Sequence, residues 1–283
     1  MMPGMRGVVW TLLATGIGWG LVLGCAEDPD RPGGVDPCAG DAEGCGNPQT
    51  GENGAGGSAG STSSPSLSAG AGGETALTGT VLEYTDDQFL YVTEFAGEAE
   101  VFADGPNGET VLAAYDGANA FLLEDVLATH WGWVGVQPVD SASDLLPTLH
   151  PVDTTSGGAL ELPMARASVV DLILRVGTSP LERDVGAAQL VLRFVDESGL
   201  ALPGITVETS DPTQPILFRD GSNWSDTDTE TLADGLALLP NLAAFELPGG
   251  TIPVTFSEGT ESFVLQPRVA QGAVTVMTVL VAP

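Results

Sequence analysis

From Thr75 onward the chain consists of short apolar runs separated by turn residues, and few folds accommodate such a pattern. The runs are rich in Val, Leu, Phe and Tyr, and clusters such as Asp104-Gly105-Pro106-Asn107-Gly108 separate them. Short strands of this kind are typical of antiparallel β-sandwiches. The predicted strands are Leu77–Tyr84, Gln88–Phe95, Glu98–Ala103, Glu109–Tyr115, Ala120–Glu124, Trp131–Gln137, Gln189–Asp196, Ile205–Glu208, Ile216–Arg219, Leu236–Leu239, Ile252–Ser257, Ser262–Gln266 and Ala273–Val281.

Two segments of this body have a distinct pattern. Ala273–Val281 is a nearly continuous apolar run, so we expect it in the centre of a sheet. Residues 168–176 are predicted to form the helix, with Ser168 as its cap, Asp171 three residues on, and Gly177 as its stop. We expect this helix to dock on a sheet and join the two halves through one apolar face, formed by Val169, Leu172, Ile173 and Val176.

The first residues have the pattern of an export signal. Met1 to Arg6 is short and basic, and Gly7 to Leu23 is a run of 17 residues without a charge. A membrane-spanning helix needs about 20 apolar residues, and this run contains four glycines. A cleaved signal peptide over residues 1–24 is therefore the better interpretation.

Val22-Leu23-Gly24-Cys25 resembles the bacterial lipobox, in which an aliphatic pair and a small residue precede a lipidated cysteine. The resemblance implies a bacterial lipoprotein that carries diacylglycerol, with acyl chains such as palmitate, on Cys25. The membrane is then a partner through this N-terminal lipid. Ala26 in place of Asp implies, by likeness to enterobacterial lipoproteins, a location in the cell outer membrane.

Residues 25–74 are predicted to be a disordered Gly/Ser/Pro-rich tether. Ala26 to Glu74 contains 13 glycines, five prolines and no aromatic residue, so it cannot bury a core. Cys38 and Cys45 lie close together, and export to an oxidising compartment favours a local disulfide, with a metal pair as the alternative. A G-x-S-x-G match at residues 56–60 lies in this tether, where a strand-turn-helix cannot form.

The second half contains the stretches Val195-Asp196-Glu197-Ser198-Gly199-Leu200-Ala201-Leu202-Pro203-Gly204-Ile205-Thr206-Val207 and Asp228-Thr229-Glu230-Thr231-Leu232-Ala233-Asp234-Gly235-Leu236-Ala237-Leu238-Leu239-Pro240-Asn241-Leu242. Together these two stretches resemble the carboxypeptidase regulatory-like, or transthyretin-like, sandwich. The resemblance implies a mainly β fold of one or two small antiparallel (prealbumin-like) sandwich domains with one short helix. The predicted divisions are a sandwich-like domain over 75–153, a connector over 154–187 and the regulatory-like domain over 188–283. Residues 118–126 weakly resemble the hairpin of the second stretch, so an internal duplication is one interpretation of the two halves. No activity follows from the family name, because the catalytic domain of those enzymes is not part of this pattern.

Charge excludes several functions. The chain has 38 acidic residues against 8 basic ones, a formal net charge of -30, and every basic residue is arginine. Nucleic acid is not an expected partner, because phosphate binding needs clustered positive charge. The lack of lysine also excludes Schiff-base chemistry and the P-loop lysine.

Few residues are suited to catalysis or metal binding. His130 and His150 are the only histidines and carry no zinc-binding spacing, so we predict neither an enzyme nor a cofactor. A Ser-His-Asp arrangement assembled in space stays open. The acids Asp220, Asp226, Asp228, Glu230 and Asp234 form either a Ca²⁺-binding loop or a plain solvated turn, and the EF-hand spacing is absent.

Trp131 and Trp133 alternate along one predicted strand and therefore share a face. They form either a stacking platform for sugar rings or part of the core, since each ring buries a large apolar area. The preferred function is a non-enzymatic, membrane-anchored envelope lipoprotein that binds or spaces an envelope protein or polysaccharide. A carbohydrate-binding surface module is the alternative, and an accessory subunit of a secreted hydrolase is the third option.

Overall fold

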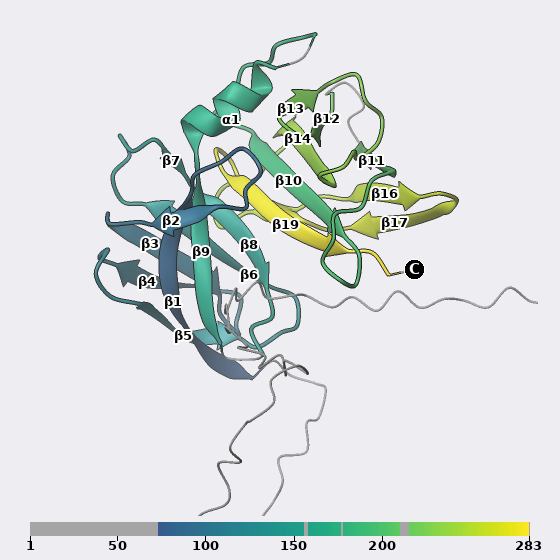
Figure 1. The fold of residues 1–283 in the computed structure, drawn as a ribbon. Coiled ribbons are helices and arrows are strands. Elements are labelled where there is room, and N and C mark those ends of the chain that lie inside the picture. The colour runs from purple at the N-terminus through teal and green to yellow at the C-terminus, as the bar shows by residue number, and fades with distance from the viewer. Residues whose placement is uncertain (1–72, 156–157, 177, 210–214, 283) are drawn as a thin grey trace, which may run out of the picture. The chain divides into compact units, whose positions relative to one another are not determined.

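The computed structural model describes residues 73–155, 158–176, 178–209 and 215–282, which belong to one compact unit. The predicted signal peptide, Cys25, Cys38, Cys45 and Gly177 lie outside the described residues. The body is mainly β with one short helix among the described residues, as the sequence predicts (Figure 1). No helix in this part of the chain has the length and apolar character to cross a membrane.

A nine-stranded sheet runs through both predicted halves (Figure 1). Near its middle β19 pairs in parallel with β10 on one side and with β8 on the other. The pairing with β8 is short, since only Val274 faces Thr148 and Thr275 faces Leu149. The strands in spatial order are β13 (Asn223–Ser225), β12 (Leu217–Asp220), β14 (Leu236–Leu242), β10 (Ala188–Val195), β19 (Val274–Leu280), β8 (Thr148–Val152), β6 (Gly132–Pro138), β3 (Ala99–Asp104) and β4 (Thr110–Tyr115).

The central position expected for the run Ala273–Val281 is confirmed. This run forms β19, which is the fifth of the nine strands from either end. It is buried on both faces, because Val274 belongs to one apolar cluster and Met277 and Val279 to another. A strand of this kind needs apolar side chains at nearly every position, which is the pattern of the sequence.

A second sheet covers one face of the first-half strands. Its strands are β2 (Val92–Glu94), β1 (Glu74–Tyr84), β9 (Ala159–Arg166) and β7 (Leu145–Leu146), with β5 (Phe121–Leu127) paired to β1. β9 lies inside the predicted connector and pairs with β1 in parallel. Gly79 of β1 permits a close approach, because an added Cβ would lie 2.1 Å from the carbonyl oxygen of Leu160. The core between the sheets contains Leu77, Val81, Val101, Phe121, Leu123, Val134, Val136, Leu162 and Met164.

A three-stranded sheet packs on the second-half strands. It consists of β11 (Ile205–Thr209), β16 (Val254–Glu258) and β17 (Glu261–Leu265), and a small pair formed by β15 (Gly250–Thr251) and β18 (Arg268–Val269) lies beside it in sequence. Phe194 of β10 and Phe256 of β16 meet with their ring centroids 5.3 Å apart. β17 is the last strand of this sheet, so its outer edge has no strand partner within the described part of the chain.

The helix α1 (Ala167–Leu174) differs in detail from the prediction. The N-cap is Arg166 and makes no side-chain capping bond, whereas Asp144 accepts hydrogen bonds from the amide and the hydroxyl of Ser168 at 3.1 and 2.5 Å. The predicted apolar face is confirmed for Val169, Ile173 and Val176, which pack in one cluster, but not for Leu172, which is 63% exposed. The buried side chains are Val170, Ile173 and Leu174, and they pack on residues of β10, β14 and β19.

One predicted strand is shorter in the structure. The sequence predicts a strand over Gln88–Phe95, but β2 covers Val92–Glu94 only. The carboxylate of Asp86 accepts hydrogen bonds from the amides of Gln88, Leu90 and Tyr91, which replaces ladder bonding over that stretch.

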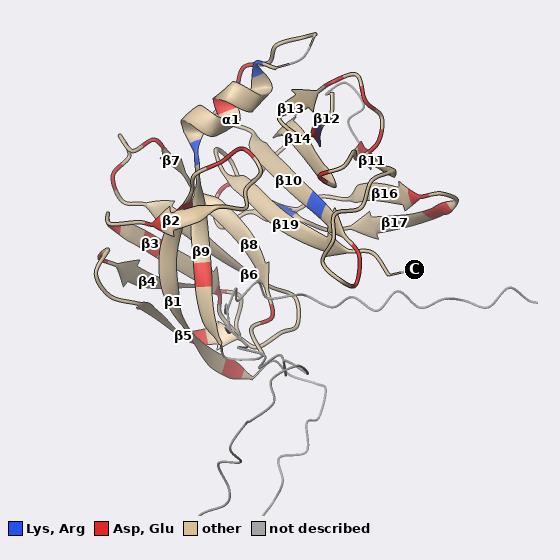
Figure 2. Ribbon diagram, viewed as in Figure 1, with Lys and Arg blue, Asp and Glu red and all other residues tan. Residues whose placement is uncertain are grey.

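Arginine–carboxylate pairs tie segments that are distant in sequence. Arg219 of β12 is 3% exposed and contacts Asp234 and Asp87, with 3.2 Å between Nη2 and Oδ1 of Asp87. Asp87 also accepts a hydrogen bond of 3.2 Å from the indole of Trp224. Arg268 binds Asp104 through both guanidinium nitrogens at 2.8 and 2.7 Å. Figure 2 shows how few basic residues the body has among its many acidic ones.

We predict that Asp87→Ala destabilises the body by about 2 kcal/mol, because it leaves a buried guanidinium short of a partner and the indole of Trp224 without its acceptor. The measurement is the urea unfolding midpoint. Glu124→Ala, at an exposed carboxylate of β5, is the matched control and should change the midpoint little. Equal midpoints for the two variants would contradict this account of Arg219.

Candidate functional site

Trp131 and Trp133 lie where strands of the two halves meet. Trp133 belongs to β6, and Trp131 stands in the turn just before it. Trp131 is 43% exposed, whereas Trp133 is half-buried and packs against two apolar clusters, one of which is the second-half core. The structure thus places one indole in solvent and the other partly in the core.

The two tryptophans line a groove of about 250 Å³ together with residues from the second half. Val264, Leu265 and Gln266 come from β17 and its end, and Met277 comes from β19. Val264 is 56% exposed, and Gln266 is the lining residue with a polar side-chain end. Sequence reasoning found the tryptophans but missed the opposite wall, because residues 264–277 are far away in the chain.

His130 stands beside the tryptophans in sequence and forms an exposed polar cluster. Its Nδ1 lies 3.1 Å from Oδ2 of Asp153 and 3.3 Å from the hydroxyl of Thr155. The Thr155 hydroxyl is also 2.5 Å from Oδ1 of Asp153. In a catalytic triad the acid and the nucleophile contact different ring nitrogens. Here both contact Nδ1, so the cluster does not have the geometry of a triad.

His150 is part of the core. It lies in β8 with 9% exposure, and its Nε2 is 3.0 Å from the carbonyl oxygen of Pro163, so this nitrogen carries the proton. Burial lowers the pKa of His150 from 6.5 to about 4, because the charged imidazolium loses its hydration there. The hydrogen bond to Pro163 opposes this shift only in part.

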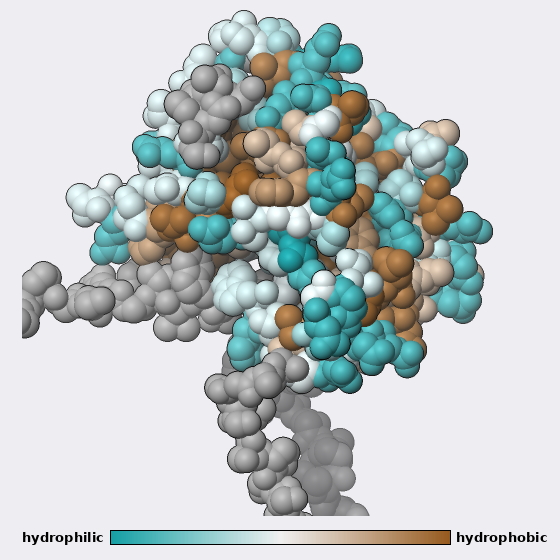
Figure 3. Space-filling model, turned by 180° about the vertical axis from the view of Figure 1, so that it is seen from behind, coloured by the Kyte–Doolittle hydropathy of each residue, from teal (hydrophilic) through white to brown (hydrophobic). Residues whose placement is uncertain are grey.

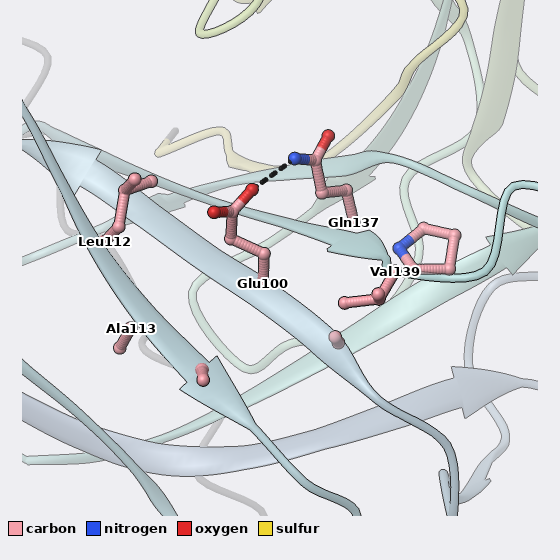
Figure 4. Close-up of a pocket in the computed structure, with 8 residues that line it drawn as sticks. Glu100, Leu112, Ala113, Gln137 and Val139 are labelled. Atoms are coloured by element: carbon pink, nitrogen blue, oxygen red, sulfur yellow. Dashed lines mark hydrogen bonds between the residues drawn. The ribbon is translucent and has the colours of Figure 1, made fainter.

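A second hollow lies on the outer side of β3, β4 and β6. It measures about 480 Å³, and Leu112 and Val139 stand on either side of Glu100 and Gln137 (Figure 4). The amide of Gln137 donates a hydrogen bond of 2.6 Å to the Glu100 carboxylate. Leu112 and Val139 are both 59% exposed. This hollow is open and carries no further charged lining residue.

Two acids of the predicted calcium loop, Asp226 and Asp228, line one hollow, but the loop does not supply a set of metal ligands. Asp226 accepts hydrogen bonds from the amides of Thr178 and Ser179, which lowers the pKa of its carboxyl group, and Asp234 contacts Arg219. Across the described ranges no three His, Cys, Asp or Glu side chains gather in a way that suits a metal ion. Binding of Ca²⁺ to this loop remains a prediction, and these contacts do not favour it.

Comparisons with known proteins identify no family for this chain. No family model matches the chain, and no curated protein matches it. A streptococcal ancillary pilin aligns at 10% identity over 74% of this chain and 69% of the pilin, with a TM-score of 0.21. A candidate cell adhesion protein from Bacteroides eggerthii aligns at 10% identity over 75% of this chain and 88% of its own, also with a TM-score of 0.21. Similarity at this level supports no functional argument.

His150 predicts a specific dependence of stability on pH. Because its folded pKa is about 4 and its unfolded pKa about 6.5, the unfolded chain binds more protons between these values. The contribution of neutral His150 is therefore complete above pH 6.5 and falls as the pH drops towards 4, by about 3 kcal/mol in total.

The test compares urea midpoints of the native chain and His150→Gln from pH 7 to pH 4. A glutamine side chain cannot titrate but still offers a donor near the carbonyl of Pro163. The native chain should lose more stability than the variant over this range. Parallel pH profiles for the two proteins would show that His150 does not titrate as described.

Proposed function

We propose that the chain is a non-enzymatic envelope lipoprotein, anchored through Cys25, whose β body binds another component of the envelope surface. The observation that carries the binding role is the groove beside Trp131, which is concave and mostly apolar with a polar residue in its wall. Grooves of this composition are the usual binding sites of proteins. Figure 3 shows, on one face of the body, apolar side chains in several patches between hydrophilic ones.

The state of the histidines supports a role without catalysis. His150 is held neutral in the core, and His130 directs one ring nitrogen at both Asp153 and Thr155. General acid–base chemistry needs a group that titrates near the working pH and faces the substrate. His150 is buried, and the Nδ1 atom of His130 already contacts Asp153 and Thr155. These two positions fit a binding or spacing module better than a hydrolase.

The anchor rests on the sequence of the first 25 residues. The uncharged run followed by Val22-Leu23-Gly24-Cys25 supports export and lipidation. Residues 26–74 then supply a Gly/Ser/Pro-rich connection to the body, which begins with β1. A linker of this composition separates a folded body from a membrane surface while leaving it free to reorient.

We predict that the full chain, expressed in a bacterial host, enters the detergent phase on Triton X-114 partitioning and that Cys25→Ser moves it to the aqueous phase. The reason is that a diacylglyceryl group supplies the hydrophobicity for membrane attachment. The double variant Cys38→Ser/Cys45→Ser is the matched control and should stay in the detergent phase. Aqueous partitioning of the native chain, or detergent partitioning of Cys25→Ser, would rule out the anchor.

A further inference from the structure

The lining of the groove suits a ring-shaped ligand with apolar faces and polar edges. The indole of Trp133 is supported from behind by two buried clusters, so its position is set before a ligand arrives. Trp131 is more exposed and lines the same groove from the turn just before β6. Two aromatic rings in the lining of one groove suit linked pyranose rings, whose C–H faces pack on aromatic rings.

The groove is small and open, so a longer chain can place one or two rings in it. Its volume of about 250 Å³ is below the range of about 300–1,000 Å³ that holds a drug-sized molecule. One or two rings of a longer chain would fill it, and the remainder of that chain would lie on the surface. Gln266, the polar lining residue, offers both donors and an acceptor to hydroxyl groups.

Charge selects among the possible polymers. The formal net charge of -30 repels polyanions such as uronic acid polymers or acidic peptides. The six residues that line the groove include no Asp, Glu or Arg, so they offer no side-chain charge to pair with a cationic or an anionic ligand. An uncharged oligosaccharide meets neither repulsion nor an unpaired charge in this groove.

We propose that the groove formed by Trp131, Trp133, Val264 and Gln266 binds a neutral oligosaccharide, with its rings stacked on the two indoles. This inference deepens the proposed function and rests on it, because it names the envelope component that the body binds. The neighbouring edge strand β17 would favour an extended peptide only through backbone pairing, and the two indoles have no part in such pairing.

The test is calorimetric titration of the full chain with three neutral hexasaccharides, built from β-1,4-linked glucose, β-1,4-linked N-acetylglucosamine and α-1,4-linked glucose. We expect at least one to bind, and Trp131→Ala to weaken that binding by about tenfold or more. Trp131→Phe should retain part of the affinity because it keeps a ring. Gln266→Ala should weaken binding to a smaller degree.

Tyr91→Ala is the matched control, because Tyr91 is another exposed aromatic residue, at 68% exposure, and does not line the groove. Gln266→Ala and Tyr91→Ala should melt at the temperature of the native chain because their side chains are exposed, and the Trp131 variants should keep a single cooperative unfolding transition at the assay temperature. The affinity should be the same at low and high salt, because no charge pairing is involved.

Three results would overturn the proposal: no binding of any hexasaccharide, binding that Trp131→Ala leaves unchanged, or binding that high salt abolishes. Tight binding of an uncharged extended peptide with no dependence on Trp131 would assign the groove to a protein partner instead. The two proposals can fail separately. If no oligosaccharide binds, but the native chain enters the detergent phase and Cys25→Ser stays in the aqueous phase, the lipid anchor stands and only the oligosaccharide site is ruled out.

Discussion

The parallel pairing of β19 with β8 joins the two halves of the body. It is short, with two facing residue pairs, yet it makes one sheet out of strands from both halves of the chain. Val274 and Thr275 of β19 are fully buried at this junction. Because β19 lies between two sets of partners and is buried on both faces, displacing it would disrupt the cores on either side, so the stability of each half depends on this strand.

The candidate site is a consequence of that pairing. Trp131 and Trp133 belong to the first half, whereas Val264, Gln266 and Met277 belong to the second. These walls come together because β6, β8 and β19 are neighbours in one sheet and β17 packs over β19. Gly135 of β6 permits close packing next to this region, since an added Cβ there would lie 2.1 Å from the ring of Phe102. The groove therefore exists only in the assembled body.

Ion pairs reinforce the same arrangement. Asp87 follows β1 and reaches Arg219 in β12, and Asp104 at the end of β3 reaches Arg268 in β18. In a chain with so few basic residues, these arginines are used to hold distant segments together rather than to attract a ligand. The acidic surface that remains favours solubility and disfavours polyanionic partners.

Local patterns in the sequence were enough to predict the class of fold, the central position of β19 and the two tryptophans of the groove. Strand periodicity and apolar runs are local properties, so they can be recognised without the tertiary structure. They missed β7, β8 and β9, because no strand is predicted between Gln137 and Gln189. Within β9 the structure accepts Pro163 because β7 pairs only with Ala165 and Arg166, which leaves Pro163 on an edge. They also misplaced the helix cap and included the exposed Leu172 in the buried face of α1. The cap partner Asp144, the buried state of His150 and the far wall of the groove come from segments distant in the chain, and only tertiary packing decides which of these meet.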